Sequence, residues 1–167
     1  MANEFTELVA WQRADELERF MLEIIKRPSI SRDKEFCEQT SGAAGSAPRN
    51  IAEGFGRFAP IQFANFLRIA IGSEKETKNQ ILKAWQRGVI TDEERDAGLL
   101  LARRAVSAAT GLRRYNLSSE ARANAKRIED ACARWADEPD EPDEPDEPDE
   151  PDEPDEPEPM DPEPDEP

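Results

Sequence analysis

The composition of the chain changes completely after residue 136, and this change limits what can fold. From Asp137 to Pro167 the sequence is an Asp-Glu-Pro repeat that loosens after Pro157. A proline at every third position removes backbone hydrogen-bond donors and prevents a continuous helix, while neighbouring carboxylates repel each other. We therefore expect a disordered, extended, polyproline-like acidic tail, up to about 95 Å long at ~3.1 Å per residue. The folded part is then confined to residues 1–136, which suffices for one domain.

The formal charge is divided unequally between these two parts. Residues 1–136 hold all 22 lysines and arginines and 19 acids, which gives about +3. Residues 137–167 hold the other 19 acids and no base, which gives −19. The formal net charge of −16 therefore describes neither part. Two hypotheses for the tail stay open: a harmless, solubilising expansion of a short coding repeat, or a competitor of nucleic acid for a basic surface of the folded part.

Helix-forming residues dominate the folded part, and no alternating strand pattern interrupts them. The predicted fold class is all-α: an antiparallel up-and-down four-helix bundle with an extra C-terminal helix, followed by the disordered acidic tail. The predicted boundaries are 1–117 for the bundle, 118–136 for the additional helix and 137–167 for the tail. The five helices are expected at about 6–26, from 31 onward, 60–87, from 91 onward and 119–135.

Local signals fix the predicted helix starts. Ser31 offers a capping hydroxyl before a run that contains early acids. Gly56 and Pro60 mark the end of one helix and the start of the next. Thr91 and Glu94 match a capping box, in which each side chain binds the backbone N–H group of the other residue.

The apolar residues of each predicted helix fall mainly on one face, which we expect to be buried. For the first helix these residues are Leu8, Trp11, Ala14, Leu17, Met21 and Ile24. For the fourth helix they are Ala97, Leu101, Ala105, Ala108, Leu112 and Tyr115. For the last helix they form a narrow seam of Ala121, Ala125, Ile128, Cys132 and Trp135. Surplus apolar residues outside the stripes indicate self-association, and these are Phe20, Ile25, Phe55 and Phe58.

Several classes of chemistry are missing from the sequence. The chain has no histidine, which removes Ser-His-Asp and Cys-His nucleophiles and most zinc sites, and it has no glycine-rich nucleotide fingerprint. We therefore predict no enzyme activity, no catalytic residue, no metal, no cofactor and no small-molecule substrate. Cys37 and Cys132 predict no disulfide framework but two inert packing thiols. No stretch predicts a signal peptide or a membrane span, so the expected location is cytoplasmic, with no membrane partner.

Basic residues are concentrated in the C-terminal part of the folded region. From Leu101 to Ala136 there are eight lysines and arginines against three acids. Since arginine donates paired hydrogen bonds to phosphate, a clustered face would bind a nucleic-acid backbone with little sequence preference. The predicted nucleic-acid-binding residues are Arg103, Arg104, Arg113, Arg114, Lys126, Arg127, Arg49 and Arg57. Two alternatives stay open: these residues are ordinary solvated side chains, or they bind an acidic protein partner.

Three short segments resemble one known family. They are NIAEGFGR at Asn50–Arg57, FLRIAIGS at Phe66–Ser73 and WQRA at Trp11–Ala14. Over roughly Phe5–Arg114 the chain resembles the four-helix-bundle family of 23S rRNA intervening-sequence proteins. Relatives of this family include the accessory variability proteins of diversity-generating retroelements. The resemblance implies a non-enzymatic protein, a homopentameric ring with a central channel, and RNA or an RNA-bound reverse transcriptase as partner.

The resemblance also sets finer expectations. It implies that the second helix continues through Asn50, with a kink near Pro48. Members of the family carry a Glu and a Gln where Glu76 and Gln80 stand, and these two side chains are expected to hydrogen-bond across the bundle. Many members also carry a basic pair after the Gln of the second helix, whereas Gln39 is followed here by Thr-Ser-Gly. The favoured function is a self-associating adaptor bound to RNA or to a reverse transcriptase, and the alternative is a protein-only scaffold or regulator.

Overall fold

The computed structural model describes residues 2–57 and 59–136, and the predicted tail at 137–167 lies outside the described residues. The described part is all-helical, as predicted, and contains no strand. A short 3₁₀ turn, Phe5–Glu7, precedes five α-helices. Their bounds are Val9–Ile25 (α1), Lys34–Gly56 (α2), Pro60–Gln86 (α3), Asp92–Asn116 (α4) and Ser119–Ala136 (α5).

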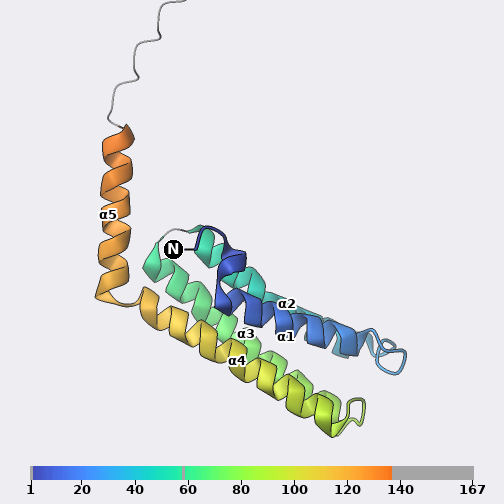
Figure 1. Ribbon diagram of the computed structural model, residues 1–167. Helices are drawn as coiled ribbons and strands as arrows, with labels where there is room; N and C mark the ends of the chain where they lie inside the picture. Colours follow the sequence, from blue (N-terminus) through green and yellow to red (C-terminus); the bar gives the residue numbers. More distant parts are fainter. Residues whose placement is uncertain (1, 58, 137–167) are drawn as a thin grey trace, which may run out of the picture.

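Helices α1 to α4 lie side by side and run alternately up and down, and this arrangement confirms the predicted bundle (Figure 1). The α1–α2 turn and the α3–α4 turn meet at one end of the bundle, and the α2–α3 turn lies at the other end. Helix α5 leaves the end of α4 and stands away from the bundle.

Helix ends follow the local chemistry, with two corrections, of which the first is that α1 starts at Val9 and not at about 6, because the 3₁₀ turn Phe5–Glu7 precedes it. The capping box is present, since Glu94 N donates to Thr91 Oγ1 at 3.2 Å and Thr91 N donates to Glu94 Oε2 at 2.9 Å. Helix α2 starts three residues later than predicted, because Asp33 is the N-cap and accepts a hydrogen bond from Phe36 N at 3.0 Å. A carboxylate at this position also interacts favourably with the helix dipole, so Asp33 outcompetes the earlier Ser31.

Small residues let the helices approach closely. Helix α2 passes through Pro48 without ending, as the resemblance implied, and the Ser73 hydroxyl hydrogen-bonds the Ser46 hydroxyl between α3 and α2 at 2.8 Å. A Cβ atom at Gly98 would lie 2.6 Å from Phe20 Cε1. Glycine therefore allows α4 to lie against the aromatic ring of α1. Phe20, which the sequence placed outside the inner stripe, is packed against the core.

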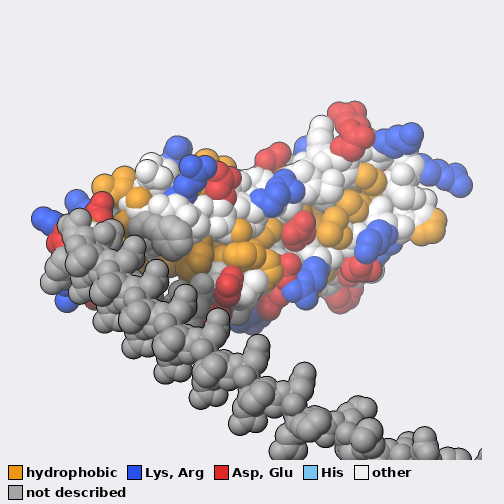
Figure 2. Space-filling model, turned by 90° about the horizontal axis from the view of Figure 1, so that it is seen from above, with side chains coloured by type: hydrophobic (Ala, Val, Ile, Leu, Met, Phe, Trp, Pro, Cys, Tyr) orange, Lys and Arg blue, Asp and Glu red, His pale blue; other side chains and the backbone are white. Residues whose placement is uncertain are grey.

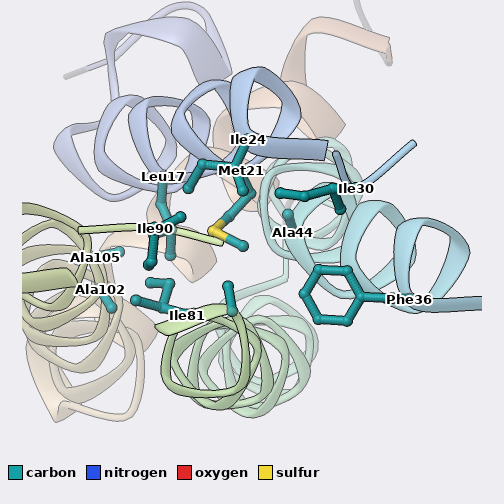
Figure 3. Close-up of a cluster of buried hydrophobic side chains, with 11 residues drawn as sticks. Leu17, Met21, Ile24, Ile30, Phe36, Ala44, Ile81, Ile90, Ala102 and Ala105 are labelled. Carbon is teal, nitrogen blue, oxygen red and sulfur yellow. The ribbon is translucent and has the colours of Figure 1, made fainter. Parts of the chain in front are cut away.

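The core forms two apolar clusters stacked along the bundle axis. The cluster nearer the paired turns joins all four helices, and its side chains point toward one another in Figure 3. Its buried members are Leu17, Met21, Ile24, Ile30, Phe36, Ala44, Ile81, Ala84, Ile90, Ala102 and Ala105. The buried members of the second cluster are Ala10, Ala14, Ala47, Ile51, Phe63, Leu67, Ala70 and Ala109. Ile25 and Phe55, expected as surplus surface, are half-buried against the two clusters.

The inner face of α4 differs from the prediction. Its buried residues are Gly98, Ala102, Ala105, Ala109 and Asn116. Of the predicted set only Ala105 is fully buried, while Tyr115 is 46% exposed. The small residues occupy the centre of the contact because they permit close approach, and the larger leucines lie on its flanks.

Helix α5 contacts the bundle mainly near its first turn. Ala121 is 5% exposed, whereas Ile128 of the same predicted seam is 51% exposed. Cys132 is exposed, which corrects the expectation of two packing thiols, and Cys37 is half-buried. None of the helices in the described part of the chain is long and apolar enough to cross a membrane.

Candidate nucleic-acid interface

The eight predicted residues lie on or at the end of three different helices. Arg49 is on α2 and Arg57 caps the end of that helix, four arginines are on α4, and Lys126 and Arg127 are on α5. Arg49 lies on the α1 side of α2: its Nη1 atom and Glu18 Oε1 both lie within 3.0 Å of the same point above Gly45. On the face drawn in Figure 2, basic and acidic side chains alternate, with apolar side chains between them.

Three of these residues already have partners or are shielded. Arg57 forms an ion pair with Glu53 at 2.5 Å, and its guanidinium stacks 5.5 Å from the centroid of the Phe66 ring. Arg127 donates a hydrogen bond to Asn124. Arg113 is half-buried, and its Nε atom is shielded from solvent without a hydrogen-bond partner in the described part of the chain. These interactions reduce what each residue can offer a phosphate group.

The four arginines of α4 point in different directions. Arg103 and Arg114 are eleven residues apart, which is about three helical turns, so both lie on one line separated by ~16 Å. Arg104 is rotated by about 100° from Arg103, because each residue of an α-helix turns by that angle. Arg103, Arg104 and Arg114 are exposed.

A groove between α3 and α4 collects a different set of cations. Its rim carries Lys75 and Lys78 of α3 and Arg103 of α4, and its volume is about 380 Å³. The apolar residues of its lining are Leu99, Ala102 and Val106, and Ser107 completes it. We call this feature the basic groove. Within the described residues none of its three cations forms an ion pair, and all three are exposed.

Helical spacing extends the basic groove toward the α5 end of the bundle. Arg68 precedes Lys75 by seven residues, about two turns, and therefore lies on the same side of α3. On α4, Arg114 continues the line of Arg103 toward the same end. Lys75 and Lys78 were not among the residues predicted from the sequence. Their three-residue spacing was a visible signal, but only the pairing of α3 with α4 places them opposite Arg103.

A buried polar layer separates the two apolar clusters at the same level of α3. Ser73, Glu74 and Thr77 are buried between Ala70 of one cluster and Ile81 of the other. Glu74 is fully buried, and neither of its carboxylate oxygens has a hydrogen-bond partner among the described residues. This corrects the expected role of Glu76, which is exposed and points away from the core.

Burial shifts the pKa of the Glu74 carboxyl group in this layer. It raises the pKa of Glu74 to about 8, because the charged carboxylate loses its hydration inside the bundle. Gln80 is buried as predicted, but its Oε1 atom, like Thr40 Oγ1, lacks a partner among the described residues. At neutral pH Glu74 is therefore mainly protonated and uncharged. The basic groove lies on the outer side of the same segment of α3.

Comparison with protein-family models identifies the 23S rRNA-intervening sequence protein family over residues 6–108. The chain belongs to this family. No curated protein matches it.

The extent of the family match divides the candidate residues. Lys75, Lys78 and Arg103 lie inside the matched segment, together with Arg49 and Arg57. Arg113 and Arg114 lie beyond it, as does the whole of α5 with Lys126 and Arg127. The basic groove is thus a feature of the part that this chain shares with the intervening-sequence proteins, and α5 is an addition to it.

Proposed function

We propose that this intervening-sequence protein is a non-catalytic, self-associating helical adaptor in the cytoplasm that binds RNA along the α3–α4 face. The observation that carries the proposal is the basic groove, where Lys75, Lys78 and Arg103 face solvent without ion-pair partners among the described residues. The family name, which refers to 23S rRNA, supports an RNA context.

The chemistry of the groove suits a phosphate backbone better than a base edge. Two ammonium groups supply point charges, and the guanidinium of Arg103 supplies a planar pair of donors. Arg68 and Arg114 extend the same face, so that an RNA strand along it would meet a succession of cations. Such contacts favour binding with little sequence preference and with a strong dependence on salt.

Self-association is supported by apolar side chains that the single chain leaves exposed. They are Val9, Ile61, Ile69, Trp85, Leu100, Tyr115, Leu117 and Ile128. The set differs from the one predicted from sequence, but a second copy would bury part of it. We propose the homopentamer that the sequence resemblance implies, and a reverse transcriptase bound to RNA as an alternative form of the RNA partner.

One observation favours a second candidate function, a scaffold for an acidic protein. The lining of the groove is apolar at Leu99, Ala102 and Val106, and apolar side chains contribute more to a protein interface than to a phosphate contact. An acidic amphipathic segment would use both the apolar lining and the three cations.

A salt titration of RNA binding tests the main proposal. The full chain should bind a single-stranded RNA with an affinity that falls linearly on logarithmic axes as salt rises, with a slope of about 0.7 per phosphate contact. Light scattering of the same sample should give a mass several times that of the monomer. If neither the full chain nor the chain without residues 137–167 binds RNA at low salt, RNA binding is wrong, and the scaffold function is favoured.

A further inference from the structure

The basic groove is a surface that combines two properties on one small area. Lys75, Lys78 and Arg103 make its rim cationic, and its apolar lining comes from successive turns of α4. An occupant that matches both properties must be acidic along two edges and apolar along a third.

The C-terminal sequence has this pattern. A polyproline II helix has three residues per turn, so a three-residue repeat places equivalent residues along a single edge. In that conformation the regular Asp-Glu-Pro repeat from Asp137 to Pro157 would carry prolines on one edge and carboxylates on the other two. The proline rings are apolar, and the prolines themselves bring no backbone N–H donor to the apolar lining.

We propose that residues 137–167 of the chain dock in its own basic groove. Carboxylates of the repeat lie against the three cations, and proline rings lie on Leu99, Ala102 and Val106. Because a shift of the repeat by three residues places equivalent side chains in the groove, the tail can dock in many alignments.

The distances allow this contact. The tail starts after α5, whose 18 residues span about 27 Å, and Arg103 lies about 20 Å back along α4 from its end. The 31 residues of the tail reach about 95 Å when extended, so they can turn back and still cover the groove. Because the tail is tethered to the bundle, its contact with the groove is intramolecular, which favours docking over binding of a free peptide of the same sequence.

This inference goes beyond the proposed function, because the docking requires no RNA. Where RNA also binds the basic groove, the tail is its competitor. The two ideas are tested separately: the docking is measured on the full chain without nucleic acid, and RNA binding is measured by the salt titration above.

Zero-length cross-linking with a water-soluble carbodiimide tests the docking, since it joins a carboxylate to a lysine amine only where the two are in contact. Mass spectrometry of the full chain at low salt should find tail peptides joined to Lys75 and Lys78 several-fold more often than to Lys34 or Lys126. Lys126 is an exacting control, because it is exposed and closer to the tail along the chain. The preference should disappear at high salt, where the ion pairs are screened.

Two substitutions on the exposed surface of α4 complete the test. Ser107→Glu adds a like charge to the groove and should lower the links to Lys75 and Lys78 several-fold. Arg104→Gln, outside the groove, should leave them unchanged. A tail that links to all exposed lysines alike, or mainly to Lys126, would overturn the proposal. So would links that join mostly isotope-labelled to unlabelled chains, because they would place the tail on another copy.

Discussion

The end of the bundle that holds the α1–α2 and α3–α4 turns and the middle of α3 differ in how their charged side chains are paired. At the end where the α1–α2 and α3–α4 turns meet, cations are paired: Arg27 with Glu94 at 2.5 Å, and Arg87 with Asp33 at 2.8 Å. At the middle of α3, Glu74 inside the bundle and Lys75 and Lys78 outside it have no ion pair with any described residue.

The paired end also uses its cations for packing. The Arg87 guanidinium stacks 4.7 Å from the centroid of the Phe36 ring, and that of Arg95 stacks 4.6 Å from the centroid of Trp85. Arg95 further pairs with Asp92 at 2.7 Å. Such paired charges join helix ends. Their hydrogen-bonding groups are already engaged, so they contribute little to the binding of a partner. The number of arginines in a segment therefore says less about binding than whether each one already has a partner.

The largest effect is expected from the unpaired carboxyl group inside the bundle. The folded-state pKa of Glu74, about 8, lies above the unfolded value near 4.3, so its contribution to stability is complete below the unfolded pKa and is lost as pH rises toward 8. Glu74→Gln should remove this loss and stabilise the protein by about 2–5 kcal/mol at pH 9. Urea unfolding at pH 5, 7 and 9 measures the difference.

A matched control for this variant is Glu76→Gln, since Glu76 is exposed two residues further along the same helix. Its free energy of unfolding should follow that of the wild type to within about 0.5 kcal/mol at each pH. If both variants gave the same profile as the wild type, Glu74 would be ionised without penalty, and the buried polar layer would be wrongly assigned.

The next effect concerns the unpaired cations outside the bundle. Changing Lys75, Lys78 and Arg103 together to Gln should weaken RNA binding on the order of 10²-fold at about 0.1 M salt and lower the salt slope by about 2, since three phosphate contacts are lost. Circular dichroism should show unchanged helix content.

Two other variants locate the site. Changing Arg19, Arg32 and Lys34 to Gln removes the same charge elsewhere and should have a much smaller effect on RNA affinity. A further variant changes the four α4 arginines (103, 104, 113 and 114) to Gln. Only those arginines that lie on the α3–α4 face should contribute to its lower salt slope of RNA binding. Equal losses in the groove variant and the distant variant would mean that net charge, and not the basic groove, governs binding.

A smaller effect is expected at the paired end. Glu94→Ala removes the acceptor of the Thr91 backbone N–H group and the Arg27 ion pair, while the hydrogen bond from the N–H group of residue 94 to Thr91 Oγ1 remains, and should destabilise the protein by about 1–2 kcal/mol at pH 7. The hydrogen bond from Arg27 lowers the pKa of Glu94, and the backbone N–H group of Thr91 adds to this. The stabilisation is therefore present above the unfolded pKa and is lost as pH falls through the lowered value. Thermal unfolding measures the effect, with Glu93→Ala, at the exposed neighbouring position, as the control. If both variants lost a similar amount of stability, Glu94 would have no special role.

The smallest effect is expected from the tail. Deleting residues 137–167 should tighten RNA binding several-fold at low salt, because −19 of tethered charge no longer competes for the basic groove. The gain should shrink as salt rises. Equal affinities of the two forms at low ionic strength would make the tail a passive solubilising segment.

Some elements were predictable because their causes are local. The Thr91–Glu94 capping box and the start of α3 at Pro60 depend on residues within one helical turn, and both were predicted correctly. The start of α2 was wrong because Asp33 and Ser31 are both competent caps, and the choice depends on where the α1–α2 turn ends. Glu74 was missed although helical spacing places it on the inner face of α3, four residues after Ala70 and seven before Ile81; the family resemblance drew attention to Glu76 instead.

The all-α class and the separation of +3 from −19 in charge can be read from the sequence alone, because composition and helix capping act over short distances. Which cations meet depends on how the helices pair in three dimensions. Lys78 and Arg103 come from helices that pair in opposite directions, and a shift of their register by a few residues would separate them. Close contacts between the two helices set that register: a Cβ atom at Gly98 of α4 would lie 3.1 Å from Ile81 Cδ1 of α3, and these residues are far apart in the chain.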